Sequence, residues 1–119
     1  MRIPPASVLM PVALHLFADK EVHSFDEAHA FLAARCDLPD QVGDESVIQK
    51  AHKSFDSRAH KTWKGLEGFG LTRSVRTRAA RITDFGESVV KENPRQITPQ
   101  YLERFPQFRE SQYFALRGV

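Results

Sequence analysis

The distribution of apolar and polar positions in the first part of the chain predicts two helices joined by a turn. Apolar side chains crowd residues 5–18 densely enough for a buried helix, within which Pro11 is a defect unless the helix begins close to it. Asp19 and Lys20 then mark the turn. Ser24 followed by Glu27 has the Ser-x-x-Glu spacing of a capping box, which predicts the start of a second helix.

A third, amphipathic helix is predicted from about residue 47 to residue 69. Its apolar positions recur at spacings of 4, 3, 4 and 3, which places them on one face: Phe55, Ala59, Thr62, Leu66 and Phe69. Gly70 suits the left-handed position that ends many helices. The polar and basic residues between these positions are therefore expected on the opposite, solvent-facing side.

Short β-prone runs and further helices follow the third helix. Residues 71–75 and 79–83 predict two strands, with residues 76–78 as the tip of their hairpin. Thr83 is the predicted N-cap of a last core helix, which Asn93 and Pro94 terminate. A C-terminal helix is expected over residues 99–114, where aromatic side chains are frequent: Tyr101, Phe105, Phe108, Tyr113 and Phe114.

This order of elements predicts a mainly α winged helix-turn-helix fold. We expect a three-helix core, a two-stranded β wing and a C-terminal helical extension. Residues 1–95 would form the winged domain, and residues 96–119 the extension or the start of a linker to a further domain. The final residues carry no stop signal or charged tail, which is typical of a piece cut from a longer protein. In such folds the third helix enters the major groove of DNA and the wing touches the backbone or the minor groove.

The charge is strongly polarised along the chain, although the formal net charge is only +2. Residues 1–49 carry three basic side chains against eight acidic ones, and residues 82–119 are balanced. Residues 50–81 carry nine basic side chains against only Asp56 and Glu67. A basic window of this kind is typical of a surface that binds a phosphate backbone.

Several motifs resemble the N-terminal domain of Mrr-type restriction proteins. The resemblance covers about residues 3–110 and rests on these segments: Arg58-x7-Leu66-x3-Gly70-Leu71, the basic hairpin, Arg81-x-Thr83-x-x-Gly86, the stretch from Ile3-Pro4 to Phe17, and Asn93-Pro94-x-x-Ile97-Thr98-x-x-Tyr101-Leu102 continuing to Phe108. Lys61 departs from the pattern, since the family usually has an aromatic residue there. The resemblance implies a DNA-recognition module that precedes a nuclease domain in enzymes attacking foreign, often methylated, DNA.

The candidate DNA-binding residues come from the third helix and the hairpin. Their spacing puts one group on the polar helix face, where they would meet the major groove: Lys53, Ser57, His60, Lys61 and Lys64. The hairpin group would hold the backbone or minor groove: Arg73, Arg76 and Arg78. Arg81 is expected on a strand, with Asp84 as an alternative partner. Asp56 would either cap the helix or accept a hydrogen bond from a cytosine amino group.

Catalytic and metal chemistry find little support in the sequence. The carboxylates of residues 39–45 lie on a predicted loop without a Glu-x-Lys pattern, so no nuclease centre is expected in this chain. The histidines lack the paired spacings of zinc sites, and neither a cofactor nor a nucleophile motif is present. Cys36 is expected to be a buried structural thiol in a reducing cytoplasm. The longest apolar stretch, Val8 to Ala18, is too short for a membrane span.

The sequence is also compatible with two other functional classes. The chain would be a stand-alone winged-helix transcription regulator if it bound a palindrome as a homodimer through its C-terminal helix. It would be a protein–protein interaction module if the basic helix and wing bound an acidic partner instead of double-stranded DNA. A dimer mass that is constant across dilution would favour the first, and indifference to DNA at low salt would favour the second.

Overall fold

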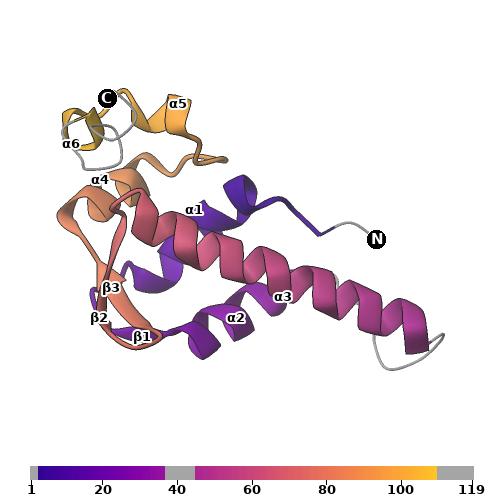
Figure 1. Ribbon diagram of the computed structural model, residues 1–119. Coiled ribbons are helices and arrows are strands. Elements are labelled where there is room, and N and C mark those ends of the chain that lie inside the picture. Colours follow the sequence, from indigo (N-terminus) through magenta and orange to yellow (C-terminus); the bar gives the residue numbers. More distant parts are fainter. Residues whose placement is uncertain (1–2, 37–44, 110–119) are drawn as a thin grey trace.

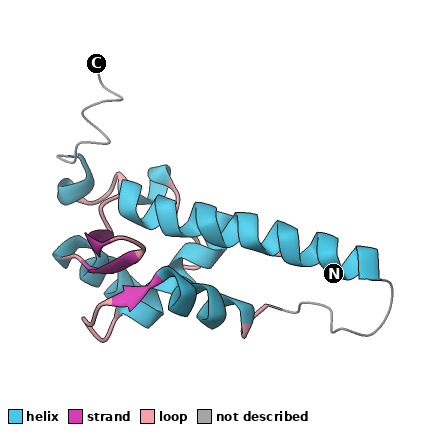
Figure 2. Cartoon of the chain, turned by 60° about the horizontal axis from the view of Figure 1, so that its bottom comes forward, coloured by secondary structure: helices cyan, strands magenta, loops and turns pink. Residues whose placement is uncertain are grey.

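The protein is mainly helical, with a small antiparallel sheet at one side (Figures 1 and 2). The computed structural model describes residues 3–36 and 45–109. The elements in chain order are α1 (Ala6–Phe17), β1 (His23–Ser24), α2 (Phe25–Ala33), α3 (Glu45–Gly68), β2 (Thr72–Arg76), β3 (Ala79–Ile82), α4 (Asp84–Glu92), α5 (Pro99–Leu102) and α6 (Pro106–Arg109).

Pro11 lies inside α1 and leaves one helical carbonyl free. That carbonyl connects α1 to the segment that follows α4. A proline has no N–H, so the carbonyl of Ser7 receives no helical bond from position 11. Instead the amide of Ile97 donates to the Ser7 oxygen at 2.9 Å. Pro11 and Ile97 are both buried. The helix defect therefore serves as a docking point for the segment that follows α4.

The sheet contains a third strand that was not predicted from the sequence. β1 pairs with β3 through His23 opposite Ala80 and Ser24 opposite Ala79, so the strand order is β1-β3-β2. The prediction of a two-stranded wing was therefore incomplete. A strand of two residues is too short to show an alternating pattern. Its second residue, Ser24, is also the N-cap of α2 and forms the predicted capping box with Glu27.

α3 is the longest helix and crosses the whole molecule, with its N-terminal end projecting beyond α2 (Figures 1 and 2). Its 24 residues correspond to about 36 Å at 1.5 Å per residue. The helix ends at Gly68, and Gly70 has the predicted left-handed conformation after it, with a φ of +81°. The Gly70 amide donates to the Glu67 carbonyl at 3.1 Å and the Leu71 amide to the Leu66 carbonyl at 2.9 Å, which is the Schellman pattern. The tight turn leads directly into β2.

Thr83 and Gly86 fix the junction between the sheet and α4. The Thr83 hydroxyl accepts from the Gly86 amide at 3.0 Å and donates to the Gly70 carbonyl at 2.6 Å. A Cβ on Gly86 would collide with the Leu71 carbonyl oxygen and lie 2.7 Å from Cγ1 of Ile82. Only glycine lets α4 approach the start of β2 so closely, which explains this glycine's place three residues after the N-cap.

The C-terminal extension packs into the same core as the preceding helices. Ile97, Leu102 and Phe108 are buried in one cluster with Phe17 and Phe55. The expected single helix over residues 99–114 was wrong in part, since α5 ends at Leu102 and α6 begins at Pro106. A proline disfavours helical geometry in the residue before it, so the helix breaks there.

Some of the expectations from sequence fall where the structure gives no description. The carboxylates Asp40 and Asp44, and the aromatic residues Tyr113 and Phe114, lie outside the described residues, whereas Glu45 begins α3. Within residues 3–36 and 45–109, no helix combines the length and the apolar character needed to cross a bilayer.

Candidate nucleic-acid interface

The structure brings the predicted helix residues together on the outer face of α3. All five are exposed: Lys53, Ser57, His60, Lys61 and Lys64. The opposite face is buried, and Phe55, Ala59 and Leu66 lie in the core cluster. Thr62 is also fully buried, and its hydroxyl donates to the Arg58 carbonyl at 2.8 Å. The 3.6-residue period of the sequence thus separates a packed face from a basic one.

The lysines of this outer face have no ionic partner among the residues that the structure describes. Among the described carboxylates of residues 3–36 and 45–109, none forms an ion pair with Lys53, Lys61 or Lys64. Exposed ammonium groups on one helix face raise the local positive potential, which attracts a polyanion. The outer face is therefore electrostatically suited to phosphate.

Sequence reasoning missed Lys50, which belongs to the same face. Lys50 and Lys53 line a shallow hollow together with Ser54, Ser57 and Arg58. Its spacing of 3 and 7 residues from Lys53 and Ser57 was a readable signal for this placement. The exposed Lys50 extends the basic face toward the projecting end of α3.

Arg58 has a structural role at the edge of this hollow. Its Nη1 donates to the carbonyl of Ile3 at 2.7 Å and to the carbonyl of Pro4 at 3.1 Å. The side chain is half-buried. The arginine therefore ties the N-terminal segment to α3, and its charge is directed at main-chain oxygens.

Asp56 does not cap α3, which was one of its two expected roles, and its carboxylate has a partner within the chain. Its Oδ1 lies 2.6 Å from Nε2 of His29 in α2. The His29 ring also packs edge-on against Phe55, with ring centroids 4.9 Å apart. Asp56 therefore joins α3 to α2, in mid-helix and away from the helix start. Sequence spacing carries no signal for a contact between residues 27 positions apart.

Arg78, predicted to contact DNA, is docked on the first turn of α2. Its Nη2 lies 3.0 Å from Oδ1 of Asp26, and its guanidinium stacks over the ring of Phe25 at 4.8 Å. Its carbonyl accepts from the Phe25 amide at 2.8 Å. Phe25 in turn contacts His60, with ring centroids 5.6 Å apart. The hairpin and the outer face of α3 therefore meet at Phe25.

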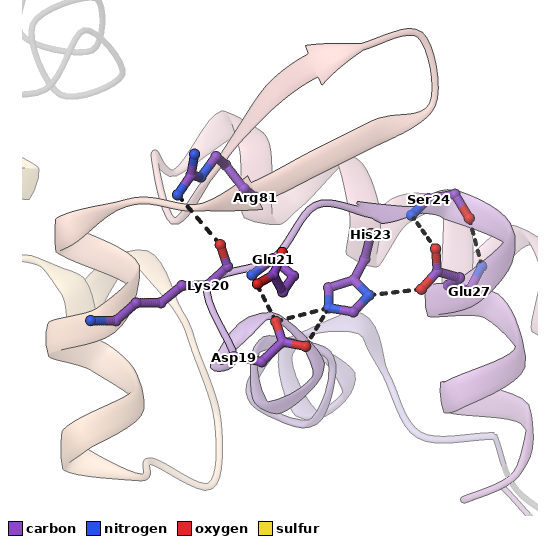
Figure 3. A network of polar contacts seen from close by, with 7 residues as sticks. All are labelled: Asp19, Lys20, Glu21, His23, Ser24, Glu27 and Arg81. Carbon is purple, nitrogen blue, oxygen red and sulfur yellow. Dashed lines mark hydrogen bonds and ion pairs between the residues drawn. The ribbon is translucent and has the colours of Figure 1, made fainter.

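Arg73 and Arg76 are exposed on the β2–β3 hairpin. Arg73 stands opposite Arg81 in the register, so both side chains leave the same face of the sheet. Nη2 of Arg81 donates to the Lys20 carbonyl at 3.4 Å, as Figure 3 shows, and this contact replaces the expected pairing with Asp84. The contacts between described residues thus join Arg78, but neither Arg73 nor Arg76, to the face of α3.

The hairpin also carries a β-bulge with an exposed apolar side chain. The register shifts between Ser74 and Arg76, which leaves Val75 as the extra residue. Val75 is 46% exposed. Arg78 has a φ of +58°, which completes the tight turn back into β3. Bulges bend a strand and re-aim its side chains, so this one directs the hairpin tip.

A hollow between α2 and α3 opens beside the basic face. It is lined by Phe25, Asp26, His29, Asp56, Ser57, His60 and Lys61. Its two carboxylates are already paired, Asp26 with Arg78 and Asp56 with His29. The hollow therefore combines the aromatic ring of Phe25 with the hydrogen-bonding groups of Ser57, His60 and Lys61.

Other potentially reactive groups form no further site in the described residues. No cluster of three or more His, Cys, Asp or Glu side chains that would hold a metal ion occurs in residues 3–36 and 45–109. Cys36 is half-buried against the core, and burial raises the pKa of its thiol. A thiol with a raised pKa is a poor nucleophile at neutral pH.

The arrangement as a whole is a basic helix face flanked by an arginine-bearing hairpin, and its charge is complementary to that of an extended anion. Comparison of this chain with models of protein families, with curated proteins and with solved structures found no match.

Proposed function

We propose that this chain binds double-stranded DNA as a winged helix-turn-helix domain. The order α1, β1, α2, α3, then the β2–β3 hairpin, is the order of that fold. In this proposal α3 is the recognition helix in the major groove. The hairpin is the wing on the backbone or minor groove.

One observation carries the proposal: the outer face of α3 is basic and exposed. Lys53, Lys61 and Lys64 lie on that face, without a carboxylate partner in the described part of the chain. A major groove about 12 Å wide admits a helix with its side chains. The helix face would then reach the phosphates on both sides of the groove and the bases at its floor.

The hairpin supports the same placement because Arg78 contacts Phe25, which in turn contacts His60 of the recognition helix. Arg73 and Arg76 are exposed and point to solvent as potential phosphate or minor-groove contacts. Arg78 differs from them because its guanidinium already forms an ion pair with Asp26. We propose that Arg78 orients the wing and contributes less to phosphate binding than Arg76.

Within this proposal the chain is the N-terminal recognition module of an Mrr-like restriction endonuclease. The motif positions named above support it physically, since Arg58, Gly70, Thr83 and Gly86 each hold a turn or terminus of the fold. A nuclease domain elsewhere in a longer protein would then cut the DNA.

Fluorescence anisotropy with labelled duplexes tests the proposal. We expect binding to unmodified and cytosine-methylated duplexes of one sequence, with an affinity that falls steeply with salt. The slope of log K against log salt should be about −0.9 for each phosphate contacted. A preference for the methylated duplex would place modification sensing in this chain. Equal binding would leave that sensing to another domain.

Two other outcomes would replace the proposal. Absence of binding at low salt would refute it and favour an acidic protein partner. A dimer of constant mass on dilution, together with selective binding of a palindrome, would favour a transcription regulator. Against that second function, Phe105 and Phe108 both contact Phe85 of the same chain, with ring centroids 5.4 and 6.3 Å away. Phe108 is fully buried in the monomer, so it is not available to a dimer surface.

A further inference from the structure

His23 lies between two carboxylates that its ring satisfies only when it is protonated (Figure 3). Its Nδ1 lies 2.7 Å from Oε2 of Glu27, and its Nε2 lies 2.9 Å from both carboxylate oxygens of Asp19. The side chain is only 11% exposed. A neutral imidazole has one N–H and can donate to one of the two carboxylates, whereas the imidazolium donates to both.

Each of these carboxylates also shapes the main chain. Oδ1 of Asp19 accepts from the Glu21 amide at 2.8 Å, within the turn that carries Lys20 at a φ of +67°. Oε1 of Glu27 accepts from the Ser24 amide at 3.3 Å as half of the capping box. His23 therefore connects the turn before β1 to the helix start after it.

The helix start that His23 supports is also the anchor of the hairpin. Phe25 and Asp26 immediately follow β1, and both hold Arg78 at the hairpin turn. His23 itself pairs with Ala80 of β3. His23 is therefore linked to the hairpin in two ways. One link runs through Phe25, two residues further along the chain, and the other is the strand pairing with Ala80.

The surroundings of His23 favour its charged form. Burial of the ring beside Phe17 opposes the charge, but the hydrogen bonds to Glu27 and Asp19 outweigh it, so the pKa of His23 is raised above its ordinary value of 6.5. The Glu21 amide and His23 lower the pKa of Asp19, and His23 and the Ser24 amide lower the pKa of Glu27.

Charged groups stand on most of the described elements around the ring. They are Lys20 and Glu21 in the turn before β1, Asp26 in α2, Arg78 and Arg81 in the hairpin, and Glu87 in α4, which pairs with Lys20 at 3.4 Å. α3 approaches this region through the uncharged Trp63, which contacts Phe17. The carboxylates that touch the ring are those of Asp19 and Glu27 alone among the described residues.

We propose that His23 is a positioning residue for the hairpin. Its protonated ring, hydrogen-bonded to both Asp19 and Glu27, holds the start of α2. Through Phe25 and Asp26, the start of α2 then fixes the hairpin beside α3. Loss of the proton frees one carboxylate, and the hairpin loosens. The effect on DNA binding rests on the proposed function, whereas the effect on the hairpin does not. Because the folded pKa is the higher one, this support is complete below about pH 6.5 and is lost as the pH rises through the folded pKa.

An NMR titration of the whole chain tests the coupling without DNA. The His23 ring resonances and the backbone amides of Phe25, Arg78 and Ala80 would be followed from pH 5.5 to pH 9. We expect the hairpin amides to shift, and to lose protection from exchange after correction for intrinsic rates, with the midpoint of the His23 ring. Hairpin amides that do not change with that midpoint would overturn the proposal.

Two variants separate positioning from general stability. His23→Gln is neutral at every pH, so its hairpin amides should be loosened throughout and should lose the pH dependence. His15→Gln is the matched control, because His15 is exposed on α1 and contacts Asn93. If His23→Gln fails to fold, the titration of the unchanged protein still decides.

DNA affinity measured over the same pH range distinguishes the two proposals. A fall in affinity that follows the His23 midpoint, and is absent from His23→Gln, supports both. His60→Gln removes the contribution of the one histidine on the proposed DNA face and should retain that fall. Absence of DNA binding at every pH refutes the proposed function while the NMR coupling stands. A pH profile unchanged in His23→Gln overturns the role of His23 and leaves DNA binding intact.

Discussion

On both faces of α3 the residues recur every three or four positions, but one face is packed in the core and the other is exposed to solvent. On the inner face, Phe55, Ala59 and Leu66 are at most 2% exposed and pack in the core. On the outer face, Lys61 and Lys64 lie in water with no carboxylate partner in the described residues. The inner face explains why the helix is stable, and the outer face is free to bind.

This difference makes stability and affinity separable on a single helix. Removal of a buried side chain costs transfer free energy and leaves a cavity. Removal of an exposed lysine changes folding by no more than about 0.5 kcal/mol, because the group has no contact to lose. The comparison would fail if an outer-face substitution unfolded the protein.

The largest effect is expected from Phe55→Ala on the inner face. Phe55 is fully buried and contacts His29 across the α2–α3 interface. We expect the free energy of unfolding to fall by about 3–5 kcal/mol. Urea denaturation followed by circular dichroism would measure it. A loss below about 1 kcal/mol would show that α2 and α3 are not packed as described.

The next effect is expected from the double variant Lys61→Ala, Lys64→Ala on the outer face. DNA affinity should fall about tenfold or more, and the salt slope should decrease by about two units if each lysine contacts a phosphate. The free energy of unfolding should stay within about 0.5 kcal/mol of its original value. Anisotropy and urea denaturation on the same preparations separate the two quantities.

Lys91→Ala is the matched control for that double variant. Lys91 is exposed at the end of α4, outside the proposed interface. Its removal also lowers the net charge and should leave the affinity within about twofold at moderate salt, because screening limits distant charges. Because Lys91→Ala removes one charge and the double variant removes two, a loss of binding free energy half as large in Lys91→Ala would mean that net charge alone, rather than the α3 face, governs binding.

The features that sequence predicted well are local ones. The capping box of Ser24 and Glu27, the left-handed Gly70 and the N-cap Thr83 are each confirmed. Each depends on residues within three or four positions, where hydrogen-bond geometry restricts the choice of side chain. The exposed side of α3 was predicted for the same reason, since its period can be read directly.

The features that sequence did not predict depend on contacts between distant segments. The pairing of β1 with β3, the bond from Ile97 to Ser7 and the pair of Asp26 with Arg78 join residues more than 50 positions apart. None leaves a periodic pattern. The consequence for the candidate site is specific, because the sequence places Arg78 among the DNA contacts while its neighbours hold it on α2.

Asp56→Asn tests the boundary between the two faces of α3. Asp56 is exposed beside Ser57 and His60 and adds a negative charge next to the proposed phosphate path. Its removal should raise DNA affinity roughly threefold at low salt, as expected for one exposed charge at several ångströms in water. Anisotropy at two salt concentrations would measure it. A decrease would instead assign Asp56 a direct contact with a base.

The smallest effects are expected at two glycines of α3, three residues apart. A Cβ on Gly68 meets nothing within 4 Å, whereas a Cβ on Gly65 runs into the end of the Met10 side chain. Met10 is only 7% exposed in the α1–α3 contact. Gly68→Ala should stabilise by up to about 0.5 kcal/mol through reduced chain entropy.

Gly65→Ala gains the same entropy but must displace Met10, so we expect it to be less stable than Gly68→Ala by about 1 kcal/mol. Urea midpoints of the two variants measured side by side would show this difference. Both substitutions leave the basic face unchanged, so neither should alter the DNA affinity of the folded protein. Equal stabilities would mean that the flexible Met10 side chain moves aside at no cost. The tightly packed face of α3 would then begin closer to Leu66 than the contact between Gly65 and Met10 indicates.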